Sequence, residues 1–94
     1  MIPLGTYKHY KGQLYEVIGI GLHTETREKM VIYKALYPTP ELTEEYGDEP
    51  HFIRPYTQFT KQIEIKGVVT PRFRFCHSEE QKNLEHKKST LNEE

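Results

Sequence analysis

The sequence has no tryptophan and a single cysteine among its 94 residues. One cysteine excludes an internal disulfide and is typical of proteins in a reducing cytoplasm, where we expect this chain. Apolar runs are only a few residues long, so we expect neither a membrane span nor a signal-peptide core. The formal net charge of −1 gives no general reason to expect binding to nucleic acid or to an acidic membrane.

The length allows one domain, and the apolar residues that would fill its core stop after Phe75. Residues 76–94 contain only Cys76, Leu84 and Leu91 as apolar side chains, among Lys, Glu, Asn, Ser and Thr. Such a segment buries too little apolar surface to offset the entropy of ordering it. The sequence therefore predicts a domain over residues 1–75 and a charged tail over 76–94, which is disordered or weakly helical.

Residues 1–75 show the alternation and the β-forming residues of a strand-rich domain. We expect strands at residues 7–10, 13–22, 30–37, 51–54, 61–65 and 68–73. Gly19 and Gly21 predict a bend or bulge in the second strand, and Gly12 and Gly67 predict tight turns. The proline-rich, acidic stretch 38–50 is expected to be a loop. Five to six short strands without a helix predict an all-β fold, a small SH3-like barrel.

Several short motifs recur in the order and spacing of one known family. They are YKHYKG at 7–12, YEV at 15–17, HTET at 23–26, VIYKALY at 31–37, FIRP at 52–55, Phe59, and PRF at 71–73. With these motifs, roughly residues 6–73 resemble a small bacterial family known as domain of unknown function 1653. The resemblance implies a compact, β-rich, SH3-like barrel and brings no established activity. The family pattern carries Trp where Phe52 stands, and Phe keeps the stacking surface without the N–H donor.

The charge of the predicted domain is uneven along the sequence. Outside the acidic stretch 38–50, residues 1–75 hold ten Lys and Arg against four acids, a net charge of +6. Several of these cations lie beside aromatic residues, an arrangement that suits single-stranded nucleic acid because cations neutralise phosphates while rings stack on bases. The predicted binding residues are Tyr7, His9, Tyr10, Lys11, Arg54 and Arg72.

Two other interpretations of these residues remain open at this point. A peptide could occupy an aromatic groove on the same surface. Alternatively, the rings fill the core, the cations face water, and Arg54 or Arg72 pairs with an internal acid such as Glu16 or Glu25. From these residues we predict a non-catalytic binding module.

An enzyme or enzyme subunit acting on a nucleotide-like small molecule is the alternative function. It would use His23 and Glu25, which lie close together in the motif HTET and could transfer protons near neutral pH. The two threonines of this motif also suit a hairpin loop that satisfies its own backbone. The five histidines lack the spacing of metal ligands, so we expect neither a metal nor a cofactor.

Overall fold

The computed structural model describes residues 1–77, which form a mostly β structure. The order is β1 (Gly5–His9), β2 (Leu14–Leu22), β3 (Lys29–Ala35), α1 (Pro40–Tyr46), β4 (Phe52–Pro55), α2 (Tyr56–Phe59), β5 (Gln62–Ile65), β6 (Val68–Pro71) and β7 (Phe73–Phe75). The tail predicted for residues 76–94 lies outside the described residues from position 78 onwards. At its start, the Cys76 N–H still donates to the Thr6 carbonyl at 2.9 Å, which continues the pairing of β7 with β1.

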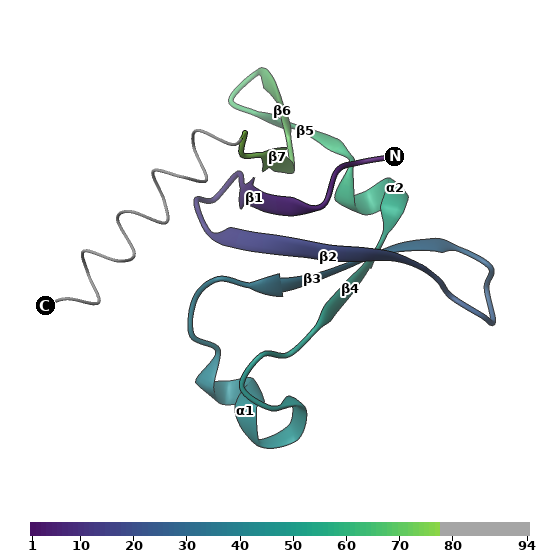
Figure 1. The fold of residues 1–94 in the computed structure, drawn as a ribbon. Coiled ribbons are helices and arrows are strands. Elements are labelled where there is room, and N and C mark those ends of the chain that lie inside the picture. The colour runs from purple at the N-terminus through teal and green to yellow at the C-terminus, as the bar shows by residue number, and fades with distance from the viewer. Residues whose placement is uncertain (78–94) are drawn as a thin grey trace, which may run out of the picture.

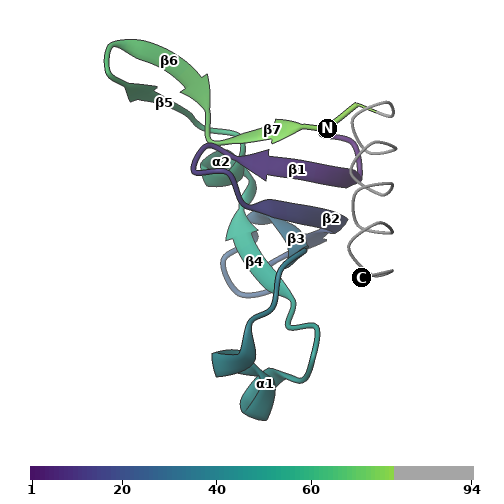
Figure 2. The same ribbon diagram turned by 90° about the vertical axis from the view of Figure 1, so that its left-hand side faces the viewer.

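Five strands form one antiparallel sheet in the order β4-β3-β2-β1-β7, and β5 and β6 form a separate hairpin. Figure 1 shows this hairpin and α1 at opposite ends of the molecule, and Figure 2 shows the hairpin extending away from the sheet. Within residues 1–77 the large sheet keeps two edges, β4 and β7, so the closed SH3-like barrel expected from the sequence is not found. The expected strand at 68–73 divides at Arg72 instead, because β6 pairs with β5 while β7 pairs with β1.

The acidic stretch expected to be a loop contains the short helix α1, which corrects that prediction. A proline in the first turn needs no hydrogen-bond partner for its nitrogen, and Glu41 follows it at the positive end of the helix dipole. Gly47, at a φ of 85°, ends the helix and donates its N–H to the Thr43 carbonyl. The residues that could have indicated this helix are Pro40 and Gly47 at its two ends. Apolar periodicity gave no indication, because α1 buries no side chain.

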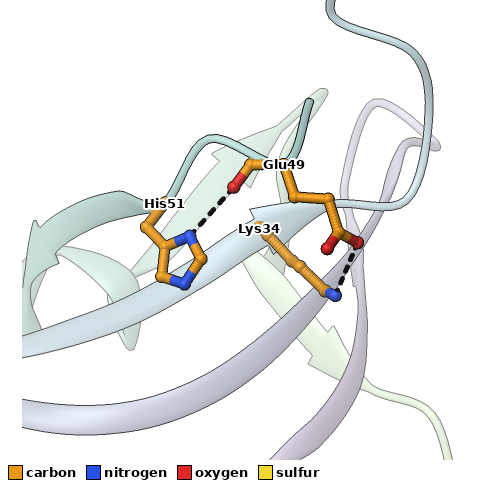
Figure 3. A network of polar contacts seen from close by, with 3 residues as sticks. All are labelled: Lys34, Glu49 and His51. Carbon is orange, nitrogen blue, oxygen red and sulfur yellow. Dashed lines mark hydrogen bonds and ion pairs between the residues drawn. The ribbon is translucent and has the colours of Figure 1, made fainter. Parts of the chain in front are cut away.

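The segment after α1 is held to the sheet by one acidic residue (Figure 3). Lys34 Nζ lies 3.0 Å from Glu49 Oε1, and this hydrogen bond raises the pKa of Lys34. The imidazole Nδ1 of His51 donates to the Glu49 carbonyl at 3.0 Å. Glu49 therefore holds the connection that leads into β4 at two points. Its carboxylate binds Lys34 of the sheet, and its backbone carbonyl accepts from His51.

The bulge expected in the second strand is confirmed. The pairing of β2 with β3 shifts register between Val17 and Gly19. Further along β2, a Cβ atom at Gly21 would lie 3.1 Å from Cδ1 of Ile32, so glycine is what lets the Ile32 side chain lie across the strand. This irregularity increases the local twist of the longest hairpin.

The core lies on one face of the large sheet, beneath α2. Its buried side chains come from five elements and are Tyr7, Val17, Val31, Tyr33, Phe59 and Phe73. Phe59 of α2 stacks on Phe73 of β7, with ring centroids 4.1 Å apart and planes 4° apart. The N-terminal segment also contacts α2, since the Ile2 N–H donates to the Tyr56 hydroxyl at 3.0 Å. Together these contacts close one half of the sheet face.

Replacing Phe59 by alanine is expected to lower the free energy of unfolding by about 3–5 kcal/mol, because it removes a fully buried ring and leaves a cavity. Urea unfolding followed by circular dichroism would measure the loss. Phe59→Leu, which retains most of the volume, is expected to cost about 1.5 kcal/mol and keeps the comparison valid if the alanine variant does not fold. The exposed Thr57 on the same helical turn supplies the control, Thr57→Ala, with a change within about 0.5 kcal/mol. Equal effects of Phe59→Leu and Thr57→Ala would contradict the packing described.

Candidate functional site

The half of the sheet face that α2 leaves uncovered carries aromatic and basic side chains. Strand register places them, since Tyr15 pairs with Tyr7, Phe52 with Tyr33, and Arg54 with Val31, so all share the face of the core. His9 shares it too, opposite Phe73. We call this region the open face, formed by His9, Tyr10, Lys11, Tyr15, Tyr37, Phe52, Arg54, Arg72 and the rim of Phe73.

Tyr15 is the central ring of the open face. It makes edge contacts with Tyr33 at 5.5 Å and with Phe73 at 5.6 Å between ring centroids. Its hydroxyl lies 2.8 Å from the hydroxyl of Tyr37, whose side chain is exposed. Burial is the main cause that raises the pKa of Tyr15, followed by this hydrogen bond. The phenol therefore stays neutral at physiological pH and is fixed in position by its partner.

Two cations of the open face lie against aromatic rings. Arg54 donates from Nε to the Tyr33 hydroxyl at 3.3 Å, and its guanidinium carbon lies 5.6 Å from the centre of Phe73. The Lys11 ammonium lies 5.8 Å from the centre of Tyr10. Cation–π contacts of this kind orient a charge while leaving its other donors available.

Arg72 is held differently, at the point where β6 gives way to β7. Its backbone is fixed on both sides, since its N–H donates to Lys61 and its carbonyl accepts from the Tyr10 N–H, both at 3.0 Å. Its side-chain Nε is buried and has no hydrogen-bond acceptor within residues 1–77. A buried donor without an acceptor is unfavourable for the folded state, although the Arg72 residue as a whole is only half-buried.

The expected pairing of these arginines with internal acids is not observed within residues 1–77. Glu16 lies opposite Lys34 on the other face of the sheet and helps to raise the pKa of that lysine. Glu25 lies in the turn between β2 and β3, away from Arg54 and Arg72. The positive charge of the open face is therefore not neutralised by the two acids that the sequence offered for it.

The pKa of His9 is affected by three cations of the open face. Burial lowers its pKa first, and Arg54, Lys11 and Arg72 each lower it further. Its ring packs on Tyr10, with centroids 4.4 Å apart, and its Nδ1 accepts the Lys11 N–H at 3.2 Å. In the neutral ring the proton therefore lies on Nε2, which gives the open face one more donor.

The structure brings together five of the six residues predicted to bind, namely His9, Tyr10, Lys11, Arg54 and Arg72. Tyr7 is the exception and is corrected to a core residue. It is 3% exposed, contacts Phe59, and donates its hydroxyl to the Pro3 carbonyl. Burial, aided by Tyr56, raises the pKa of Tyr7 to about 12.

Sequence reasoning left Tyr15 and Tyr37 out of the binding residues. The signal that could have identified Tyr15 is the turn at Gly12. A tight turn at this point fixes the register of β1 on β2, and that register places Tyr15 beside Tyr7 and on the same face as His9. Tyr37 follows the end of β3, where periodicity no longer indicates a face.

The alternative catalytic residues lie at the tip of the β2–β3 hairpin. His23 Nδ1 accepts the backbone N–H groups of Glu25 and Thr26, both at 3.2 Å. The Thr26 hydroxyl accepts the Glu28 N–H at 3.3 Å. These contacts satisfy backbone N–H groups of the turn. They also occupy Nδ1 of His23, so this nitrogen is not available to act as a general base.

Within residues 1–77, no three His, Cys, Asp or Glu side chains gather closely enough to share a metal ion. Neither α1 nor α2 has the length and apolar character needed to cross a bilayer.

Fold and site together define a small antiparallel β domain whose sheet face is half closed by α2 and half open, aromatic and basic. Residues 5–75 match the family described as Protein of unknown function (DUF1653), and the chain belongs to this family. This confirms the resemblance drawn from the sequence motifs. A crystal structure of a DUF1653 protein from Bordetella bronchiseptica is similar, with a TM-score of 0.68 and 28% identity over 80% of this chain and 87% of that one. No curated protein matches the chain.

Replacing Arg54 by glutamine is expected to raise the pKa of His9, because one of the cations that oppose its protonation is removed. The ring Cε1–Hε1 signal of His9, followed by NMR as pH is lowered, would report the midpoint in each protein. In the unaltered protein we expect a midpoint below the usual value of about 6.5. Arg27→Gln, in the β2–β3 turn, makes the same charge change away from the open face and should leave the midpoint where it was. A midpoint at or above the usual value in the unaltered protein would refute the convergence of charge.

Proposed function

We propose that this protein is a non-catalytic binding module that holds single-stranded nucleic acid on the open face. The observation that carries this proposal is the convergence of Arg54, Arg72 and Lys11 around His9, beside partly exposed rings and without the acids expected to pair with them. Cations placed next to rings supply both contacts that a single strand offers, one for phosphates and one for bases.

Each group has a distinct role in the proposed complex. Arg54 and Arg72 present guanidinium groups to phosphate oxygens from fixed backbone positions. A proline borders each of them, Arg54 lies in β4, and the Arg72 backbone is hydrogen-bonded on both sides. Tyr10 and Tyr37 are 42% and 40% exposed and provide flat surfaces for stacking. The neutral His9 donates from Nε2 to a phosphate or base oxygen.

An acidic peptide is the other ligand whose charge suits this surface. Exposed tyrosine faces favour bases, because every base offers a flat π surface to a ring. The two ligands also differ in how their binding responds to salt, since nucleic acid releases a condensed counterion for each phosphate that is neutralised.

We include a cytoplasmic setting in the proposal. The sequence has a single cysteine, Cys76, which is typical of proteins in a reducing compartment.

Replacing Arg54 by glutamine is expected to weaken binding of a mixed-sequence single-stranded RNA by about tenfold and to lower the salt slope by about 1, because one phosphate contact is lost. Fluorescence anisotropy at several salt concentrations would measure both quantities. Lys11→Gln is expected to act in the same direction, and its exposed side chain can be changed without disturbing the core.

The matched control is Arg27→Gln, which removes the same charge from the β2–β3 turn. Its affinity and salt slope should equal those of the unaltered protein. If Arg27→Gln weakens binding as much as Arg54→Gln does, the attraction is general and no defined surface exists. If the unaltered protein does not bind at low salt, the proposed function is wrong.

A further inference from the structure

A groove lies where the β5–β6 hairpin leaves the large sheet. It has a volume of about 400 Å³ and is lined by Lys8, His9, Tyr10, Ile65, Val68 and Arg74, among others. Figure 2 shows the hairpin extending outwards from the start of β7, which lies beside β1. This volume is in the range of sites that take one small ligand, and a single nucleotide has that size.

The groove is continuous with the open face. His9 and Tyr10 line it and also belong to the open face, so the two regions meet at the end of β1. Because side chains alternate along a strand, His9 faces the core side while Lys8 points to the opposite side. A ligand that passes over the exposed Tyr10 ring therefore moves from one region into the other.

The charges of the groove suit an anion as well. Lys8 and Arg74 are direct cross-strand partners on β1 and β7, and both side chains are exposed. The cross-strand pairing therefore brings two cationic side chains to the same side of the groove. The aliphatic wall comes from the hairpin, where Val68 is 62% exposed.

We propose that this groove binds the continuation of the same nucleic acid strand, with a phosphate at Lys8 and Arg74 and the adjoining base between Tyr10 and Val68. This inference rests on the proposed function. It adds a second subsite, so that the bound strand bends around Tyr10 and the site takes a strand longer than the open face alone can hold.

Two labelled single-stranded RNAs, of about four and about ten nucleotides, separate the groove from the open face. Lys8→Gln is expected to weaken binding of the longer RNA about fivefold and to lower its salt slope by about 1, with little effect on the shorter one. Val68→Asp, which places a negative charge in the groove, is expected to weaken the longer RNA by tenfold or more.

Val69 supplies the matched control, because it neighbours Val68, is 64% exposed and points to the other face of the hairpin. Val69→Asp makes the same charge change and should leave both affinities within about twofold, since it lies outside the groove. Circular dichroism melting of each variant would confirm that the fold is retained, as expected for exposed positions.

Several outcomes would overturn the groove proposal. If Lys8→Gln and Val68→Asp leave the longer RNA unaffected while Arg54→Gln weakens it, the groove proposal fails and the proposed function stands. Equal effects of Val68→Asp and Val69→Asp would show that the added negative charge repels RNA from either face of the hairpin, which contradicts binding in the groove. An acidic peptide that binds the unaltered protein but not Val68→Asp, without displacing RNA, would assign the groove to a peptide instead. Failure of both RNAs to bind the unaltered protein would remove both proposals.

Discussion

The stacking of Phe59 on Phe73 determines which part of the sheet face is closed. α2 is a single turn, and this ring contact, parallel to within 4°, is how it seats on the sheet. This turn packs mainly against β3 and β4 and leaves the rest of the sheet face uncovered. Phe73 also contacts His9, Tyr15 and Arg54, so one ring belongs to the core and to the open face alike. His9, Tyr15 and Arg54 are therefore positioned by the packing that stabilises the fold, while Tyr10 and Lys11 come from the β1–β2 turn.

The separation of charge follows from the same sheet geometry. Strand alternation sends Glu16 and Lys34 to one face and leaves Arg54 on the other, with His9. Glu49 is engaged with Lys34, so the acidic segment around α1 is anchored on the side away from the open face. A chain with a net charge of −1 can thus carry a locally positive surface. The local electrostatic potential of this surface thus depends on where the charges are placed rather than on their total.

Local patterns predicted most of the strands, since alternation and turn glycines act over a few residues. The hairpin turns at Gly12 and Gly67 and the bulge before Gly19 were all accessible in this way. Long-range pairing was not. The break at Arg72 depends on β7 pairing with β1, more than sixty residues earlier in the sequence, and nothing local indicates it. The same limit explains Tyr7 and Tyr15, because both are β-forming residues in good strand patterns and only the position of α2 decides which one is buried.

The burial of His9, together with the cations around it, makes protonation of its ring unfavourable in the folded state. Because its pKa is lowered in the folded state, protonation favours unfolding, and stability falls as pH drops through the usual histidine value of about 6.5. The buried Nε of Arg72 adds a second unfavourable element, since it has no acceptor within residues 1–77. Replacing Arg54, Lys11 or Arg72 by a neutral side chain would bring the pKa of His9 closer to its usual value. An anion held among these cations would raise the pKa of His9, because its charge opposes theirs. The cations that lower the pKa of His9 are the same ones to which the proposed function assigns the anionic ligand.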